Sequence, residues 1–309
     1  MTRRNRLASL GSLMFAVLLM MALFGTLLWT VQSSRAATFE VEVGESIQAA
    51  IDSAGPGDTI RVQSGVFPES LVIMKSLTLE GGYDSAFENR APRTSIISLT
   101  TEGRVVKVEG ASLDVTIDGF EIKGGDTIGD PGSGLYADLV GGILRISDNI
   151  LRDNTTNVEG GGVYLNLSQG ADILITETEV VSNSAQYGSG VYALLDEASH
   201  LRVIGNELEG NISSSRGGGI YTELSSESWV DIMHNNIISN YASNAGGGIF
   251  VEGEDRTTVT INDNIVARNV VSSNSSTGAG IYATLIMSGT FRLNNNQVMT
   301  NTNGGSLNA

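Results

Sequence analysis

Residues 217–240 read GGGIYTELSSESWVDIMHNNIISN, and this stretch decides the fold. Positions in phase with Ile220 alternate with positions in phase with Tyr221, and the same alternation returns at Val230 and Ile232. A shorter apolar segment follows the paired asparagines. An apolar period of two is typical of strands rather than helices. The stretch therefore predicts three short strands joined by turns.

The same pattern recurs along the chain. A glycine-rich tag followed by an aliphatic and an aromatic residue occurs six times, with the aromatics spaced by 28, 28, 29, 29 and 32 residues: Tyr136, Tyr164, Tyr192, Tyr221, Phe250 and Tyr282. A second tag ends in asparagine and, except for Thr178, has asparagine at its fourth position: Asn149, Asn154, Asn183, Asn206, Asn211, Asn235, Asn240, Asn264, Asn269, Asn296 and Asn301. Two tags in phase over six copies indicate a solenoid.

Coils of about 28–29 residues with three strands each predict an all-β, right-handed parallel β-helix. Inward side chains would stack as aliphatic columns, and each strand would pair with its counterpart about 4.8 Å away in the next coil. We interpret the asparagines as structural, because asparagine tolerates left-handed backbone at a sharp bend and stacked copies can hydrogen-bond as a ladder. The glycine runs predict positive backbone angles or close packing of coils.

The first 36 residues are typical of an export signal. Three arginines precede an apolar stretch from Leu13 to Val31, and small residues allow cleavage after Ala36. An uncleaved signal anchor is the alternative, because 19 apolar residues can span a bilayer. In both cases we expect the remainder to be secreted or held at the cell surface, with membrane contact only through this segment.

Two further parts follow. Residues 37–130 are predicted to hold an amino-terminal capping helix at Ser46–Ala54 and irregular first coils, and residues 131–309 to form the regular coils. The early strands are expected at Thr59–Val62, Leu71–Leu79, Val105–Val108 and Val115–Ile122. No cap is visible after Asn301, so we expect a truncated chain or association through the last coil, with the final residues poorly ordered. The inward layer exposed there would be Ile281, Leu285, Phe291, Leu293 and Val298.

The charge balance limits the partners. The chain has 18 Lys and Arg against 34 Asp and Glu, which gives a net charge of −16, or −20 without the four arginines of the first 36 residues. Such an acidic body repels phosphate backbones, so nucleic-acid binding is disfavoured. The chain has no cysteine, which excludes disulfides and thiolate metal sites. An extracellular polysaccharide or a surface protein is the expected partner.

Three segments of the amino-terminal part carry a family resemblance: SIQAAIDSAGPGDTIRVQSGVFPESLVI (46–73), SLTLEGGY (76–83) and VTIDGFEI (115–122). On these segments the chain resembles the pectin-lyase-like superfamily of right-handed parallel β-helices, and the resemblance extends from Phe39 to about Asn301. The GGGIY and N-x-x-x-x-N coils are similar to repeats of bacterial surface and polymorphic outer-membrane proteins. The resemblance implies the fold, but this fold carries lyases, hydrolases, epimerases and proteins without known chemistry.

Catalytic signatures of these enzymes are largely missing. The sequence contains no Asp-Asp pair with an R-I-K-like segment, no D-P-H-E, no G-x-S-x-G and no H-E-x-x-H. His200 and His234 are interpreted as ordinary exposed residues at or beside turns. Pectate-lyase chemistry, which needs acidic Ca²⁺ ligands and an Arg or Lys base, has too loose a spacing to be excluded.

The repeat register predicts a stripe of aromatic side chains on the exterior, comprising the six aromatics of the first tag. Flanked by polar residues two positions further on, such a stripe could stack sugar rings along a polymer. The alternative, which we favour, is that stacked aromatics only reinforce the sheet through cross-strand contacts.

Stacked carboxylates form the remaining candidates. Glu223 and Glu252 lie on adjacent coils, where they could share a proton or bind Ca²⁺, with Arg216 or Arg256 as a candidate base. A second acidic group near the asparagine turns has the same two interpretations: Asp148, Glu177, Glu179 and Glu207. Solvated glutamates without perturbation are the simpler reading of both groups. No cofactor other than Ca²⁺ is indicated.

The leading hypothesis is an exported, non-catalytic solenoid that acts as a surface, adhesion or interaction module. The alternatives are a polysaccharide lyase or other carbohydrate-active enzyme, and a carbohydrate-binding surface without turnover.

Overall fold

The computed structural model describes residues 36–273 and 278–304. Residues Ala37–Ala309 form one compact unit, distinct from Met1–Ala36, and the fold below is that of this unit. The predicted export signal lies outside the described residues. Across the described ranges, no helix has the length and apolar character needed to cross a membrane.

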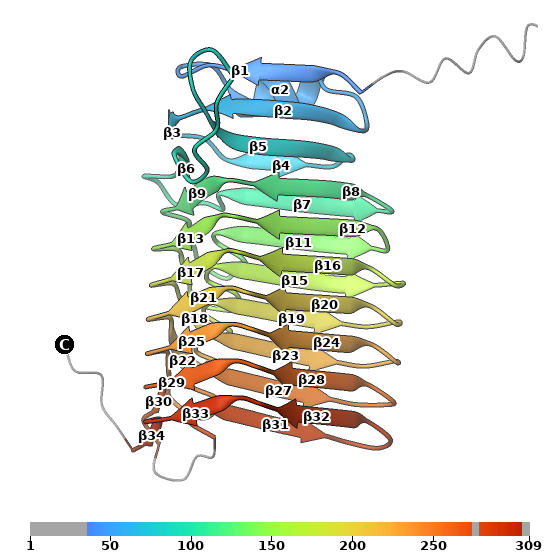
Figure 1. The fold of residues 1–309 in the computed structure, drawn as a ribbon, viewed down its shortest axis with the longest axis vertical. Coiled ribbons are helices and arrows are strands. Elements are labelled where there is room, and N and C mark those ends of the chain that lie inside the picture. Colours follow the sequence, from blue (N-terminus) through green and yellow to red (C-terminus); the bar gives the residue numbers. More distant parts are fainter. Residues whose placement is uncertain (1–35, 274–277, 305–309) are drawn as a thin grey trace, which may run out of the picture. The chain divides into compact units, whose positions relative to one another are not determined.

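The described strands stack coil upon coil into four parallel sheets (Figure 1). The ten-stranded sheet consists of β1 (Thr38–Val41), β2 (Asp58–Gln63), β5 (Leu77–Tyr83), β8 (Asp114–Asp118), β12 (Ile143–Ser147), β16 (Asp172–Thr176), β20 (His200–Ile204), β24 (Trp229–Met233), β28 (Thr258–Asn262) and β32 (Thr290–Asn294). The eight-stranded sheet consists of β4 (Leu71–Ile73), β7 (Val106–Ala111), β11 (Leu135–Val140), β15 (Val163–Ser168), β19 (Val191–Leu195), β23 (Ile220–Leu224), β27 (Ile249–Gly253) and β31 (Ile281–Leu285).

Shorter strands complete each coil. The nine-stranded sheet consists of β3 (Gly65–Phe67), β6 (Ser95–Ser98), β9 (Phe120–Lys123), β13 (Ile150–Arg152), β17 (Glu179–Val181), β21 (Glu207–Glu209), β25 (Asn236–Ile238), β29 (Ile265–Ala267) and β33 (Gln297–Met299). The seven-stranded sheet consists of β10 (Asp126–Thr127), β14 (Thr155–Thr156), β18 (Ser184–Tyr187), β22 (Ile212–Arg216), β26 (Tyr241–Ala242), β30 (Val270–Val271) and β34 (Thr302–Asn303).

The seven-stranded sheet corrects the prediction of three strands per coil. Most of its strands have only two residues, such as Tyr241–Ala242, and so carry no alternation that a sequence pattern could detect. It begins with β10, so the earlier coils have fewer strands than the regular ones.

The interior consists of aliphatic columns in the predicted register. Ile220 pairs with Ile249 and Val230 with Val259 in the next coil, and all four side chains are fully buried. Parallel pairing at constant register places like residues above one another, so each coil buries the apolar layer of its neighbour.

Two of the predicted early strands are each divided at a corner. The stretch Leu71–Leu79 forms β4 and part of β5, which belong to different sheets. The stretch Val115–Ile122 forms β8 and β9, separated by Gly119 with φ +80°. A glycine at positive φ turns the chain between two sheets where a continuous strand was expected.

A short helix lies beside the first strands. Helix α2 (Ile47–Ser53) begins after Ser46, whose hydroxyl accepts a hydrogen bond from the backbone N–H of Ala49. Its apolar residues Ile47 and Ile51 are buried, and it contacts β1, β2 and β4. Glu69 accepts hydrogen bonds from the backbone N–H groups of Ile47 and Gln48, at 2.7 and 3.2 Å.

The asparagines form two columns of buried amides at the corners on either side of the nine-stranded sheet. In the first column, the amide nitrogen of Asn235 donates to the carbonyl of Val203 at 2.8 Å and to Oδ1 of Asn264 at 2.9 Å. The oxygen of Asn235 accepts from the backbone and side-chain N–H groups of Asn206, at 2.8 and 3.0 Å. Thr178 continues this column, donating its backbone N–H to Asn206 at 2.9 Å. Each coil is thus bonded to both of its neighbours through one side chain.

The asparagines do not make the bend themselves, which corrects the prediction from the sequence. The positive φ angle lies on the residue before each of them, for example 52° at Asp148 and 58° at His234. The asparagine side chain points inward to hydrogen-bond backbone groups, so the exposed preceding residue takes the left-handed conformation.

Glycines of the first tag have both roles that were expected. Gly217 has φ +63°, whereas a Cβ at Gly219 would lie 2.6 Å from the carbonyl oxygen of Gly248 in the next coil. The tag therefore turns the chain and allows close approach of adjacent coils.

The last described coil leaves its apolar layer accessible. Phe291, Leu293 and Val298 are 40%, 47% and 51% exposed, whereas Ile281 and Leu285 are partly buried. The expected disorder of the final residues concerns positions 305–309, which lie outside the described residues.

Candidate functional site

The aromatic residues of the first tag form one continuous column. Adjacent rings from Tyr136 to Tyr282 lie 4.7–5.4 Å apart and within 14° of parallel. Their backbones pair in register across the eight-stranded sheet, for example Tyr192 with Tyr221. The column arises because one residue type recurs at the same place in every coil, and offset stacking stabilises each pair beyond simple burial.

The column is not the exterior stripe that the sequence predicted. Tyr192, Tyr221 and Phe250 are only 6%, 3% and 1% exposed, and they form a second hydrophobic cluster. The ring of Tyr187, from the seven-stranded sheet, covers Tyr221 edge-on at 5.9 Å. Tyr136, Tyr164 and Tyr282 are partly buried. The fourth strand, which the sequence pattern did not reveal, thus brings a cover over rings that were expected to face solvent.

The candidate carboxylates Glu223 and Glu252 are brought together, as register partners of adjacent coils. Both accept from the hydroxyl of Tyr221, at 2.8 and 3.3 Å. Arg216 lies 3.4 Å from Glu252 and over the ring of Phe250 at 5.3 Å. The group is therefore a partly solvated network in which the tyrosine hydroxyl bonds to both carboxylates and the guanidinium pairs with Glu252.

Burial and the neighbouring glutamate control the acidity of the column. Burial, followed by the negative charge of Glu223, raises the pKa of Tyr192 well above its usual value. Burial and the hydrogen bond to Glu223 do the same for the pKa of Tyr221. Burial, followed by Tyr136 and Glu159, raises the pKa of Tyr164 to about 12. The raised pKa values keep these hydroxyls protonated into alkaline solution, and those of Tyr192 and Tyr221 donate to Glu223.

Arg256, the other candidate base, does not join this group. Its guanidinium pairs with Glu227 at 2.8 Å and with Asp255 at 3.4 Å in exposed positions. These are surface ion pairs at coil edges, where the energetic contribution is small.

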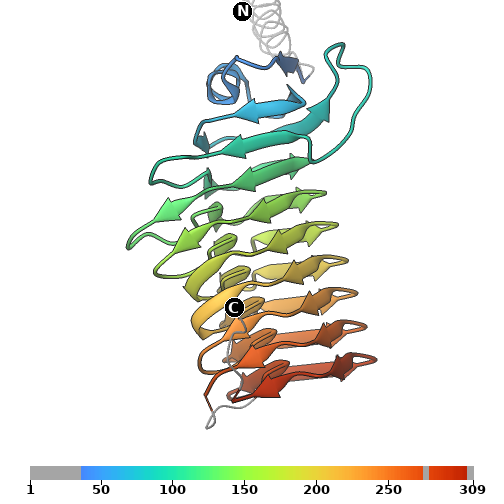
Figure 2. The same ribbon diagram turned by 90° about the vertical axis from the view of Figure 1, so that its left-hand side faces the viewer.

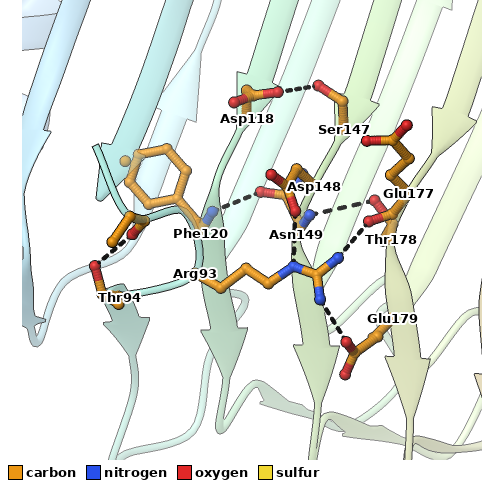
Figure 3. A network of polar contacts seen from close by, with 12 residues as sticks. Arg93, Thr94, Asp118, Phe120, Ser147, Asp148, Asn149, Glu177, Thr178 and Glu179 are labelled. Atoms are coloured by element: carbon orange, nitrogen blue, oxygen red, sulfur yellow. Dashed lines mark hydrogen bonds and ion pairs between the residues drawn. The ribbon is translucent and has the colours of Figure 1, made fainter. Parts of the chain in front are cut away.

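The second acidic group has a cation at its centre that the sequence did not indicate. Arg93 donates to Asp148 at 2.8 Å, to the backbone carbonyl of Glu177 at 2.6 Å and to the carboxylate of Glu179. Figure 3 shows the guanidinium lying between these groups. Arg93 belongs to the loop between β5 and β6, which leaves the stack (Figure 2). The contacts span 55 to 86 residues of sequence, so no repeat pattern announces them.

A shallow cavity of about 280 Å³ adjoins this network, and we call it the Gly205 cavity. Its lining residues are Arg93, Glu177, Thr178, Glu179, Gly205, Asn206, Glu207, His234 and Asn236. Glu207 pairs in register with Glu179 of the previous coil and Asn236 of the next. Burial, followed by the charges of Glu179 and Glu209, raises the pKa of Glu207.

The two histidines differ. His234 is exposed at a turn, as predicted. His200 is the first residue of β20 and is mostly buried, with Nε2 3.0 Å from Asp231 and its ring 4.6 Å from that of Trp229. The hydrogen bond from His200 lowers the pKa of Asp231. His200 is therefore part of a polar contact across strands, which corrects its interpretation as an exposed residue beside a turn.

Four of the candidate Ca²⁺ ligands already have protein partners, because Glu223 and Glu252 accept from Tyr221 and Asp148 and Glu179 pair with Arg93. Within residues 36–273 and 278–304, no set of three or more His, Asp or Glu side chains is arranged to hold a metal ion. In the second group, the guanidinium of Arg93 lies where a cation between Asp148 and Glu179 would lie.

Comparisons with known proteins identify the family of this chain. A family model described as a right handed beta helix region matches residues 104–308. The chain belongs to this family. No curated protein matched the chain. Among solved structures, pectate lyase Pel9A is 13% identical with a TM-score of 0.50, covering 85% of this chain and 80% of its own. Pectin methylesterase from Aspergillus niger is 12% identical with a TM-score of 0.37, covering 86% of each chain. At this identity the likeness to the pectate lyase concerns the fold alone.

Membership of the right-handed β-helix family agrees with the repeat and with the resemblance to the pectin-lyase-like superfamily. The candidate sites also contain Arg93, Tyr187, Gly205 and Asn236, which were not predicted from the sequence. Among these, only Gly205 gave a signal in the sequence, because it is the one glycine at the position before Thr178 and the asparagines of the first column.

Proposed function

We propose that this protein is an exported, non-catalytic β-helical solenoid that acts as a binding or adhesion module at the cell surface. The observation that carries the proposal is the network around Tyr221. Its hydroxyl donates to both Glu223 and Glu252, and Arg216 pairs with Glu252. Glu223, Glu252 and Arg216, the candidates for Ca²⁺ binding and proton transfer, thus stabilise the aromatic column, which supports a structural role for them.

The export part of this proposal depends on the sequence of residues 1–36. The arginine-rich start, the apolar stretch and the small residues before Ala37 support processing by a signal peptidase. Amino-terminal sequencing of the protein recovered from an expression host's envelope and medium tests it. A new amino terminus at Ala37 is expected for cleavage, whereas a membrane-bound intact chain would indicate the signal anchor.

We further propose that α2 caps the first coil. Its buried Ile47 and Ile51 face β1, β2 and β4, and Glu69 binds the free backbone N–H groups at its start. A solenoid needs its terminal apolar layer covered. Replacing Ile51 with Glu should therefore lower the melting temperature and increase self-association in light scattering.

A single assay tests the absence of turnover against the presence of binding. The full chain is incubated with a panel of polysaccharides, with and without Ca²⁺, while ultraviolet absorbance of unsaturated products and new reducing ends are followed. Retention of the protein in gels that contain each polymer is measured in parallel. Retention without product is the expected result, and product formed by the wild-type chain but not by Glu223→Gln would overturn the proposal.

A further inference from the structure

The Gly205 cavity exists because one side chain is missing from a column. The residues that precede Thr178 and the asparagines of the first column share a left-handed backbone: Asp148, Glu177, Gly205, His234, Asp263 and Asn295. Gly205 alone among these six has no side chain, and a Cβ placed there would meet nothing within 4 Å. The hollow therefore lies between the side chains of Glu177 and His234, above the backbone of Gly205.

The walls of the cavity present both donors and acceptors. Glu207 and Asn236 are outward-facing register partners on β21 and β25, and the same position holds Glu179 in the previous coil and Ile265 in the next. Arg93 and His234 add further polar hydrogens. Such mixed groups converging on a small hollow are what the vicinal hydroxyls of a sugar ring require. A volume of about 280 Å³ suits one ring rather than a larger ligand.

The charges around the cavity select among sugars. Arg93 is engaged by Asp148 and Glu179, so its charge is already balanced. Glu177 and Glu207 add negative charge at the rim. Burial and neighbouring glutamates raise the pKa of Glu207, which reflects the same excess of negative charge. A carboxylate on the ligand would be repelled here.

We propose that the Gly205 cavity binds one unit of a glycan that carries no carboxylate, through hydrogen bonds from its hydroxyls to Glu207 and Asn236. This inference rests on the proposed function as a binding module and names its ligand class and site. It distinguishes the protein from one built to hold a polyuronate, because the cavity lacks unengaged cations among the described residues that line it.

Titration calorimetry on the full chain tests the proposal, with neutral hexasaccharides of glucose and xylose and a hexamer of galacturonate as probes. Gly205→His fills the cavity with the side chain that the next coil carries at nearly the same backbone angle, since φ is 70° at Gly205 and 58° at His234. Gly210→Ser is the matched control, because Ser182 and Ser239 occupy the equivalent positions beside it in the second asparagine column.

We expect a neutral hexasaccharide to bind, Gly205→His to weaken binding by about tenfold or more, and Gly210→Ser to leave it unchanged. Glu207→Gln should weaken binding by about fivefold. If Gly205→His has a lowered melting temperature, the affinity of Glu207→Gln is the measurement that tests the site. Binding unaffected by Glu207→Gln and by a folded Gly205→His would overturn the site but not the proposed function. Tighter binding of the galacturonate hexamer, or no binding of any probe, would overturn the ligand class, whereas turnover would overturn the proposed function alone.

Discussion

The aromatic column and the Arg93 network both connect successive coils, but they are built differently. The column repeats one residue type at one register position, and neighbouring rings such as Tyr221 and Phe250 lie 4.7 Å apart. The network depends on Arg93, a single residue from a loop, which contacts groups as far as Glu179. Loss of one ring leaves other stacked pairs in place, whereas loss of the guanidinium removes every contact of the network. The aromatic column therefore spreads its stabilisation over many ring pairs, whereas the Arg93 network depends on one residue.

Alkaline titration should distinguish the aromatic column from the Arg93 network most strongly. Tyr164 has its pKa raised to about 12 by burial, from 10.0, and the pKa values of Tyr192 and Tyr221 are also raised. Because the unfolded state loses these protons first, the stabilisation is fully present below about pH 10 and is lost as the pH rises through about 12.

We therefore expect tyrosinate absorbance to increase as the circular dichroism signal of the fold disappears, in one cooperative step above pH 10. The Arg93 network contains no tyrosine. Tyrosinate absorbance that reaches its full value near pH 10 while the fold persists would show that the column is open to solvent.

A break in the asparagine column should have the next largest effect. Asn235→Val removes hydrogen bonds to Val203, Asn206 and Asn264 and leaves their buried groups without partners. We expect a loss of roughly 3 kcal/mol, measured as a fall in the thermal or urea midpoint. Asn236→Val is the control, because Asn236 is exposed and should change stability by no more than about 0.5 kcal/mol. Equal effects of the two substitutions would contradict the column.

Removal of the guanidinium should cost less. Arg93→Met leaves Asp148 and Glu179 without their shared cation, but both are partly solvated, so we expect a loss of about 1 kcal/mol that shrinks in high salt. Arg145→Met breaks an exposed pair with Asp114 and provides the comparison, with an expected loss of about 0.3 kcal/mol. Equal melting temperatures of Arg93→Met and Arg145→Met would contradict a special contribution of Arg93 to stability.

The smallest expected effect tests the hydroxyl rather than the ring. Tyr221→Phe keeps the stack, since Phe250 occupies the same position one coil later, but it removes the bonds to Glu223 and Glu252. A loss of about 0.5 to 1 kcal/mol is expected in urea unfolding. Tyr164→Phe, in the same column, serves as the reference. A loss of several kcal/mol would indicate that the carboxylates, and not the rings, hold these coils together.

The parts of the molecule that repeat could be predicted from the sequence, and the parts that occur once could not. The positions of Ile220, Tyr221 and Asn235 follow from periodicity, because the same environment recurs in each coil. The burial of Tyr221 could not be predicted, because its cover includes Tyr187, whose short strand β18 has a register shift that interrupts the alternation. Arg93 was missed because its partners lie 55 and 86 residues away without any repeat of its own.

The asparagine columns have a direction, and this affects how the chain folds as it emerges. Asn264 accepts the hydrogen bonds of Asn235, and Asn235 accepts those of Asn206, so each amide-to-amide bond finds its acceptor in the coil that follows in sequence. A chain delivered amino terminus first has its newest coil with unsatisfied buried amides until the next 28 or 29 residues arrive. A coil therefore gains its full set of asparagine hydrogen bonds only when the next coil has formed, so stable structure trails the emerging chain by one coil.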